Sequence, residues 1–353
     1  MVVPDIKSLR SQIDLELQER TNRYTLELSS IGEELIPVSE ALRDFAAGGK
    51  RFRPIFAYLG YRGAGAKLQE SILTACASLE FIHICALIHD DLMDGSDERR
   101  KNPSIHRRFE KLHRDEQYRG DPERFGAAAA ILLGDLALVW GDRILTDSGI
   151  NSDELTRSLP IFNLMRDELM AGQYLDVLEG ALATTSVERS LRVARFKSGK
   201  YSIERPLHFG AALAGATQDY FEIYTRYGIP LGEAFQLRDD ILGVFGDPTI
   251  TGKPAGDDLR EGKRTVLMAI THQRASKVQK EKLTTLLGKP GLTANEIESL
   301  QEIIIETGAR QECESLINSL ADQAKNALKD GALESDSKAH LVDMIELATK
   351  REL

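Results

Sequence analysis

Two clusters of aspartates, each at the end of a long apolar stretch, are the residues of this sequence most able to do chemistry. ALIHDDLMD contains Asp90, Asp91 and Asp94, and FQLRDDILG contains Asp239 and Asp240. On a helix, residues three and four apart share a face, so the first three carboxylates would reach one small volume. Two acidic helices favour a site for a hard cation such as Mg²⁺, which takes oxygen ligands, water and substrate phosphates. A pair of solvated acidic helix ends is the alternative.

Basic residues in four places complement these clusters. GGKRFRP, ERRKNP, RFKSGKYS and TGKPAGDDLREGKRT contain Lys50, Arg51, Arg53, Arg99, Arg100, Lys197, Lys200, Lys253, Lys263 and Arg264. Arginine binds phosphate oxygens in pairs and lysine supplies a point charge. The net charge is −10, which argues against nucleic acid or an anionic membrane as a partner, so any anion site must be local. The P-loop pattern GxxxxGK[ST] is absent. The four places therefore favour a diphosphate held between cations and metal ions over scattered surface charges.

Helical periodicity dominates the stretches that must position these side chains. Apolar residues recur at three- and four-residue spacing within 9–36, 71–94, 125–145, 226–245, 299–328 and 337–350. Strand-type alternation does not extend beyond a few residues, and no long linker divides the chain. We predict an all-α bundle of many helices in a single domain spanning 1–353, with 1–40 as an N-terminal helical segment.

The cysteine content and the N-terminus bear on the compartment. The three cysteines, Cys76, Cys85 and Cys313, have no CxxC spacing, so neither a disulfide framework nor a zinc site is expected, and a reducing cytoplasm fits. The first twenty residues lack the apolar core of a signal peptide, and no uninterrupted apolar run of 18 residues exists. We therefore expect a cytoplasmic protein without integral membrane association.

Taken in order, the motifs resemble those of the trans-isoprenyl diphosphate synthases, or polyprenyl synthetases, over about residues 40 to 270. The series is GGKRFRP, FIHICALIHDDLMD, RRKNPSIH, LLGDLAL, KSGKYS, FQLRDDILGVFGDP and TGKPAGDDLREGKRT. It is most similar to the bacterial geranylgeranyl diphosphate synthase branch. The resemblance implies helices around a central apolar cavity, usually in a homodimer. It also implies head-to-tail condensation of isopentenyl diphosphate with an allylic prenyl diphosphate, by Mg-assisted ionisation, condensation and proton loss.

The resemblance also implies roles for individual residues. The metal ligands, for three Mg²⁺ per active site with Mn²⁺ as a substitute, would be Asp90, Asp91 and Asp94 on one wall and Asp239 and Asp240 on the other. The allylic diphosphate or its metals would be contacted by Arg99, Lys197, Gln236 and Lys253. Isopentenyl diphosphate would be held by Lys50, Arg53, His83 and Arg100, and Lys263 would close over the site. The catalytic set would be Asp90, Asp91, Lys197, Asp239 and Lys253.

Two positions depart from the family pattern. The second motif usually reads DDxxD, but Gly243 stands in its last place, so that metal shell is short of one ligand. Asp257 or Asp258 is a candidate to help through water. Lys101 stands where the family commonly has glycine after its arginine pair, so we expect that turn to differ slightly.

Two histidines near the first cluster need separate interpretations. His83 lies seven residues before Asp90, two turns away on roughly the same face, which favours a substrate role over a satisfied core histidine. His89 points about 100° away from Asp90, which favours a structural hydrogen bond. We also interpret Asp135 in LLGDL as structural.

Small residues before Asp90 predict the product length. The product tail would grow alongside this helix, and Cys85 and Ala86, one turn before Asp90, are small enough to let it pass C15. Phe81 and Ile82 lie another turn deeper and are placed to stop it. We expect a C20 product, with C15 and C25 or longer as alternatives and a plain packing role for the small pair as a further one.

Three other classes of protein compete with this interpretation. A terpene cyclase shares the first motif and the fold, but it needs no second diphosphate site, which Lys50 and Arg53 indicate. A metal-dependent phosphohydrolase would need more histidine ligands than seven histidines readily supply. A non-catalytic helical subunit would tend to lose the aspartates, and five remain.

Overall fold

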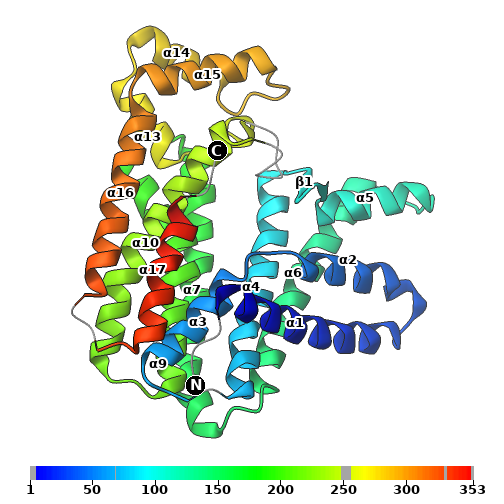
Figure 1. Cartoon of the computed structure of the whole chain (residues 1–353). Helices are drawn as coiled ribbons and strands as arrows, with labels where there is room; N and C mark the ends of the chain where they lie inside the picture. Colours follow the sequence, from blue (N-terminus) through cyan, green and yellow to red (C-terminus); the bar gives the residue numbers. More distant parts are fainter. Residues whose placement is uncertain (1–4, 68, 248–255, 330–331, 351–353) are drawn as a thin grey trace. The chain divides into compact units, whose positions relative to one another are not determined.

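The computed structural model describes residues 5–67, 69–247, 256–329 and 332–350, and their contacts divide the chain into two compact units (Figure 1). Unit 1 comprises residues 1–161, 206–216 and 334–340. Unit 2 comprises residues 162–205, 217–333 and 341–353. Each unit buries its own apolar residues. The single domain expected from the sequence stays a prediction.

Unit 1 is built around the two long helices α4 and α6, which pack against each other. Its helices are α1 (Ile6–Ser29), η1 (Glu33–Leu35), α2 (Ile36–Ala47), α3 (Phe52–Gly63), α4 (Glu70–Asp94), α5 (Ile105–Asp115) and α6 (Pro122–Thr146). It also includes the start of α7 (Ser152–Leu182), most of α9 (Arg205–Ala214) and the start of α17 (Ser335–Thr349). Helices α1 and α2 lie side by side, as Figure 1 shows in blue.

Helix α4 is buried on nearly all sides, as its continuous apolar sequence predicts. Trp140 of α6 anchors the α4–α6 contact: its ring centroid lies 5.7 Å from that of Phe81 on α4 and 5.3 Å from that of Tyr24 on α1. Such aromatic contacts contribute about 0.5–1.5 kcal/mol beyond area burial. Helix α4 is therefore a rigid core element, and it carries the first aspartate cluster at its end.

Unit 2 is organised around α10 (Gln218–Phe245), which carries the second aspartate cluster. Its other helices are the remainder of α7 and α17, α8 (Val187–Val193), η2 (Ala194–Glu204), α12 (Asp257–Glu261), α13 (Val266–Arg274), α14 (Lys277–Leu286), α15 (Ala294–Glu306) and α16 (Ala309–Ala327). Arg238 on α10 ties the helices of this unit together. Its Nη atoms donate to both carboxylate oxygens of Glu314 on α16, and its Nε donates to the carbonyl of Thr349 at 2.8 Å.

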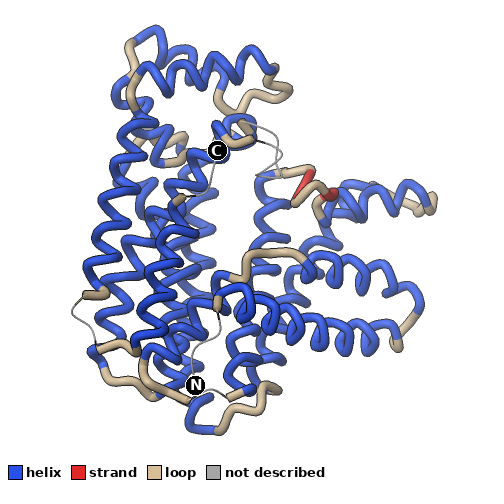
Figure 2. The backbone as a smooth tube through the Cα atoms, in the orientation of Figure 1, coloured by secondary structure: helices blue, strands red, loops and turns tan. Residues whose placement is uncertain are grey.

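The all-α prediction is confirmed, with local differences from the expected helices (Figure 2). The stretch 299–328 is not one helix, because Gly308 adopts φ 70° between α15 and α16. The stretch 9–36 ends its first helix at Ser29. Between α4 and α5, two two-residue strands, β1 (Glu98–Arg99) and β2 (Asn102–Pro103), pair antiparallel.

Two helices have the length and mean hydropathy to cross a membrane, although neither contains an uninterrupted apolar run of 18 residues. These are α4, whose most apolar window is 72% buried inside the protein, and α6, whose window is 39% buried. The burial of α4 is that of a core helix. The more exposed α6 bears a row of exposed apolar side chains at Phe125, Leu132 and Val139.

Candidate diphosphate and metal site

The first aspartate cluster occupies the last turn of α4. Asp91 is fully buried, whereas Asp90 and Asp94 are partly exposed. The helix ends at Gly95, whose N–H donates to the carbonyl of Asp91. The C-terminal end of a helix carries partial negative charge, which disfavours each nearby carboxylate by about 0.3–1 kcal/mol. Three aspartates there are therefore stable only beside compensating positive charge.

A tight hairpin brings that positive charge to the cluster. Strands β1 and β2 place Arg99 so that its guanidinium binds the Asp91 carboxylate through Nε, at 2.9 and 3.1 Å, and through Nη2. Its Nη2 also lies 4.0 Å from an oxygen of Asp90. The intervening Arg100 and Lys101 have φ of 54° and 65°, the conformation of a two-residue hairpin turn with both central residues left-handed. Lys101 thus occupies a position that favours glycine, and Arg99 is a counter-charge of the aspartates.

His83 lies on α4, two turns before the aspartates, and the charges of four arginines act on it. Burial lowers the pKa of His83 well below its usual value, and the positive charges of Arg53, Arg100, Arg99 and Arg51 lower it further. The imidazole is therefore neutral at pH 7. Unit 1 thus brings His83, Arg53, Arg99 and Arg100 into one positive region that suits an anion, and the substrate roles of these residues stay a prediction. Lys50 lies exposed on the loop that precedes Arg51.

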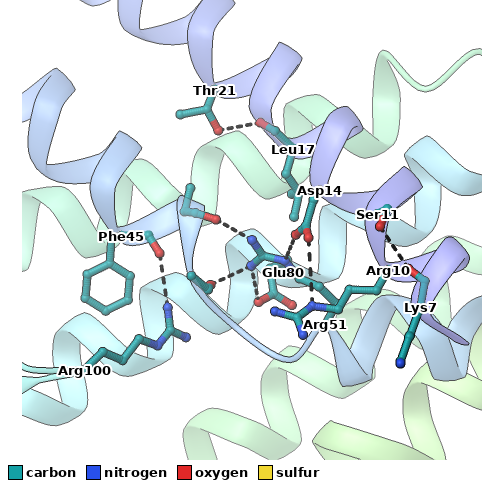
Figure 3. Close-up of polar contacts among 12 residues, drawn as sticks. Lys7, Arg10, Ser11, Asp14, Leu17, Thr21, Phe45, Arg51, Glu80 and Arg100 are labelled. Atoms are coloured by element: carbon teal, nitrogen blue, oxygen red, sulfur yellow. Dashed lines mark hydrogen bonds and ion pairs between the residues drawn. The ribbon is translucent and has the colours of Figure 1, made fainter. Parts of the chain in front are cut away.

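The loop that carries Lys50 and leads into α3, where Arg53 lies, is fixed by Arg51, which is 2% exposed (Figure 3). Arg51 donates to Asp14 on α1 at 2.7 Å and to Glu80 on α4 at 2.9 Å. It also donates to the carbonyl oxygens of Gly48, at 2.8 Å, and Ala46, at 2.6 Å. Burial lowers the pKa of Arg51, but the two carboxylates more than offset this and leave its pKa raised. Arg51 is therefore charged, and it fastens the loop to two helices.

The second aspartate cluster lies on α10 in unit 2. Asp240 is buried and accepts a hydrogen bond from Gln236 at 2.8 Å, while Asp239 is partly exposed. Burial raises the pKa of Asp240 to about 8, the Gln236 hydrogen bond opposes this, and the nearby charges of Asp258 and Asp239 raise it further. A buried carboxylate facing two others is an environment that a cation would stabilise.

Asp258 fills the space that the missing side chain at Gly243 would occupy. A Cβ built on Gly243 would overlap the carboxylate of Asp258, which begins α12 together with Asp257. Lys263 lies beside it, with Nζ 3.7 Å from Asp258 and 2.8 Å from Glu261. The departure from the DDxxD pattern is thus accompanied by a carboxylate from another part of the chain in nearly the same place.

Lys197 lies on η2, an eleven-residue π-helix packed against α10. π-Helical turns are rare and occur frequently at functional sites. Lys197 Nζ donates to Asp176 on α7 at 2.6 Å, and Lys200 pairs with Glu168 at 2.8 Å. Unit 2 therefore contains Lys197, Gln236, Asp239, Asp240 and Lys263 of the predicted set, while Lys253 lies outside the described residues.

The clustered donors are carboxylate oxygens, which suits Mg²⁺. Within residues 5–67, 69–247, 256–329 and 332–350, no three His, Cys, Asp or Glu side chains are placed to enclose an ion by themselves. Mg²⁺ is usually held by one or two carboxylates together with water and substrate phosphates, so the donors fit this mode of binding. The placement of the two aspartate helices on opposite walls stays a prediction.

The residues predicted to set product length are buried in unit 1. Phe81 and Ile82 are inaccessible and face α6, and Cys85 is also buried, whereas Ala86 is partly exposed. His89 makes the expected structural contact, with Nε2 3.1 Å from the carbonyl oxygen of Ile131. Asp135 is exposed, and its carboxylate lies 3.8 Å from the same nitrogen.

Comparisons with known proteins identify the family of this chain. The polyprenyl synthetase family model matches residues 37–304. The chain belongs to the polyprenyl synthetase family. It is 30% identical over 335 residues to geranylfarnesyl diphosphate synthase of Aeropyrum pernix, covering 94% of this chain and 98% of that one. It is 28% identical over 352 residues to geranylgeranyl diphosphate synthase of Methanosarcina mazei, covering 99% and 98%.

The same family includes a very similar solved structure. Geranylgeranyl pyrophosphate synthase from Corynebacterium glutamicum, complexed with isoprenyl diphosphate and magnesium, superposes with a TM-score of 0.95. It is 41% identical, and the match covers 99% of this chain and 100% of that one.

Three polar residues of this polyprenyl synthetase were missed by sequence reasoning or given no role by it. In the sequence Arg51 is only one residue of a basic cluster, whereas in the structure it is buried and hydrogen-bonds to Asp14 and Glu80. Glu80 could have been noticed, because it is the only charged residue between Glu70 and Asp90. Asp176, the partner of Lys197, lies within a polar helix face and gives no distinctive signal in the sequence.

Restoring the family pattern at position 243 is expected to destabilise the protein. Replacing glycine inside a helix ordinarily gains up to about 1 kcal/mol, but Gly243→Asp must displace the Asp258 carboxylate and adds a like charge, at a cost of about 1–3 kcal/mol. Urea unfolding in metal-free buffer measures this difference. The double variant with Asp258→Ala should recover most of the loss, with Asp258→Ala alone as control. A single variant as stable as wild type would contradict the overlap.

Proposed function

We propose that this protein is a prenyltransferase that condenses isopentenyl diphosphate head-to-tail with an allylic diphosphate, giving a short-chain all-trans prenyl diphosphate. The observation that carries the proposal is the gathering of four arginines around a neutral His83, directly before the helix end that holds three aspartates. Such a site suits an anion on one side and divalent cations on the other. The family, and relatives named as geranylgeranyl, geranylfarnesyl and farnesyl diphosphate synthases, support this proposal.

The proposed isopentenyl diphosphate site lies in unit 1. Its residues are Lys50, Arg53, His83 and Arg100. The neutral imidazole of His83 can donate one hydrogen bond to a phosphate oxygen, while the cations around it supply charge. Arg99, which pairs with Asp91, lies between this site and the aspartates and is suited to the second, allylic diphosphate.

The roles proposed at the allylic diphosphate and its metals follow the family resemblance. The metal ligands are Asp90, Asp91 and Asp94 with Asp239 and Asp240. The groups that contact the diphosphate or its metals are Lys197, Gln236, Lys253 and Arg99, with Lys263 closing over them. We propose three Mg²⁺ ions, replaceable by Mn²⁺, and the Corynebacterium structure in complex with magnesium supports the choice of metal. Bound there, Mg²⁺ would neutralise charge that develops on the departing diphosphate.

The side chains have two further proposed roles, to stabilise the leaving diphosphate and to exclude water. Lys197 and the arginines stabilise the leaving diphosphate, so the allylic carbon can ionise. The apolar residues of α4 keep water from the carbocation until the double bond of isopentenyl diphosphate reacts. The departing diphosphate itself is the proposed acceptor of the final proton, so the reaction requires no nucleophilic Ser, Cys or His.

A direct assay tests the proposed function. The purified protein is incubated with Mg²⁺, radiolabelled isopentenyl diphosphate and dimethylallyl, geranyl or farnesyl diphosphate in turn. We expect labelled prenyl diphosphates, and none after the metal is chelated, because the leaving group then keeps its charge. Asp90→Asn should lower kcat by about 10²-fold or more, while Asp115→Asn, at an exposed aspartate of α5, should not. Absence of product with every starter would reject the proposal.

We further propose that the product is C20, with C15 and C25 as the alternatives. Cys85 and Ala86 are small, and the next turn toward the start of α4 presents Phe81, whose ring is held against Trp140. One helical turn rises about 5.4 Å, close to the length of one isoprene unit. A tail that passes the small pair would therefore meet the Phe81 and Ile82 level about one unit later.

Enlarging Cys85 is expected to shorten the product. Cys85→Phe should shift the main product from C20 toward C15, because the ring would occupy the level that the last isoprene unit needs. Chromatography of the dephosphorylated products measures this shift. Cys85→Ser, which keeps the residue small, is the matched control and should leave the length unchanged. An unchanged product from Cys85→Phe would remove this position from the length-setting set.

We also propose that the protein is a homodimer and acts in the cytoplasm. Phe125, Leu132 and Val139 are exposed on α6 at seven-residue spacing, with Ile131 beside them. A seven-residue apolar repeat is the pattern of helices that pack along one another. The stripe therefore suits α6 of a second copy. The three buried cysteines are free thiols, as a reducing compartment would maintain.

Charging the α6 stripe is expected to separate the dimer. Sedimentation velocity should give twice the mass of one chain for wild type and the mass of one chain for Leu132→Glu, because the substitution would bury a charge in the contact. Val278→Glu, at an exposed apolar position of α14, is the matched control and should stay dimeric. A monomeric wild-type protein would disprove the dimer.

A further inference from the structure

Glu80 is a buried carboxylate in the apolar part of α4, and the proposed chemistry does not use it. It is 1% exposed, and its charge interacts with those of Arg51 and Arg100. Its Oε1 accepts a hydrogen bond from Arg51 Nη1 at 2.9 Å. Its Oε2 is buried and has no hydrogen-bond partner among the described residues. A carboxylate is costly to bury, so its presence here calls for a specific role.

Glu80 faces two arginines at once. Besides the hydrogen bond to Arg51, its negative charge raises the pKa of Arg100, although burial of the guanidinium, the larger effect, leaves that pKa lowered. Arg100 extends back over the loop, with Nη1 3.4 Å from the carbonyl oxygen of Phe45 and the guanidinium 5.7 Å from the Phe45 ring (Figure 3). Glu80 is thus the anion shared by Arg51 and Arg100.

The double glycine of the loop passes close to these charged groups. A Cβ built on Gly48 would lie 2.7 Å from Arg100 Nη1. A Cβ built on Gly49 would lie 2.9 Å from Glu80 Oε1 and 3.0 Å from Arg51 Nη1. Gly49 also has φ 136°, a backbone conformation that residues with a Cβ rarely adopt. The loop backbone therefore passes beside the Glu80 carboxylate at Gly49, the residue before Lys50.

We infer that Glu80 is a positioning residue for the isopentenyl diphosphate site, holding Lys50 and Arg53 through Arg51 and holding Arg100 by direct attraction. This inference rests on the proposed function, because it concerns the diphosphate that these three cations bind. Glu80 does not touch the substrate. It fixes the relative placement of groups that come from the loop and from the β1–β2 hairpin.

If Glu80 acts by positioning, Glu80→Gln changes the KM for isopentenyl diphosphate in the direction opposite to that expected from its charge alone. Glu80→Gln removes negative charge from a positive region, which by electrostatics alone would attract diphosphate more strongly and lower its KM. If Glu80 acts by positioning, the loop and Arg100 loosen, and the KM for isopentenyl diphosphate rises by about tenfold or more. The KM for farnesyl diphosphate should remain within about twofold, because Arg99 is held by Asp91 instead.

The experiment compares steady-state kinetics of wild type, Glu80→Gln and Glu154→Gln with both substrates varied. Glu154 is another buried glutamate of unit 1, which accepts a hydrogen bond from the Asn151 N–H, so its replacement controls for loss of a buried carboxylate. A selective rise in the KM for isopentenyl diphosphate in Glu80→Gln alone supports the inference. A fall, no change, or equal changes in both KM values would overturn it.

A second variant covers the case in which Glu80→Gln does not fold. Arg51→Met with Glu80→Met removes both members of the buried ion pair, and such apolar replacement of a buried pair is often tolerated. It should show the same selective rise, with calorimetric titration of isopentenyl diphosphate showing correspondingly weaker binding. A folded double variant that binds like wild type would overturn the inference. A wild-type protein that neither turns over nor binds isopentenyl diphosphate would instead refute the proposed function and the inference with it.

Discussion

The burial of one guanidinium, that of Arg51, is the constraint on which the arrangement of unit 1 depends. A charge with 2% exposure is stable only if its donors are satisfied, and Arg51 distributes them over Asp14, Glu80 and the carbonyls of Ala46 and Gly48. These partners come from α1, the end of α2 with the loop that follows it, and α4. Removing one partner of a buried ion pair typically costs about 3–5 kcal/mol. Three segments far apart in the sequence are therefore fixed at a single point.

Charges of opposite sign stabilise one another throughout the candidate site. Three aspartates at the negative end of α4 are offset by Arg99, and the arginines around His83 are offset by Glu80 and Asp91. Each group would be unfavourable alone, because like charges and helix dipoles oppose it. In unit 2, Lys197 and Asp176 form the same kind of pair. The site thus consists of functional groups that are also one another's structural partners.

The sequence was most informative where function and periodicity coincide. The end of α4 and the all-α class followed from the apolar spacing and from the family resemblance. The break at Gly308 was missed because apolar periodicity continues across it. The overlap of Asp258 with the Gly243 position could not be predicted from the sequence, because it depends on where the short helix α12 lies. Glu80 was also missed, although it is the only charged residue between Glu70 and Asp90, and its burial shows why it matters. Whether the two aspartate helices face each other stays a prediction.

The left-handed turn at Arg100 and Lys101 has a consequence for binding. Each non-glycine residue in that conformation is disfavoured by about 1–2 kcal/mol, so the neighbouring pairing and ion pairs must hold the turn in place. A segment held this firmly has little conformational entropy left to lose. In the proposed function, the two arginines of this hairpin are preorganised for two different diphosphates, and a diphosphate that binds there need not order the chain around it.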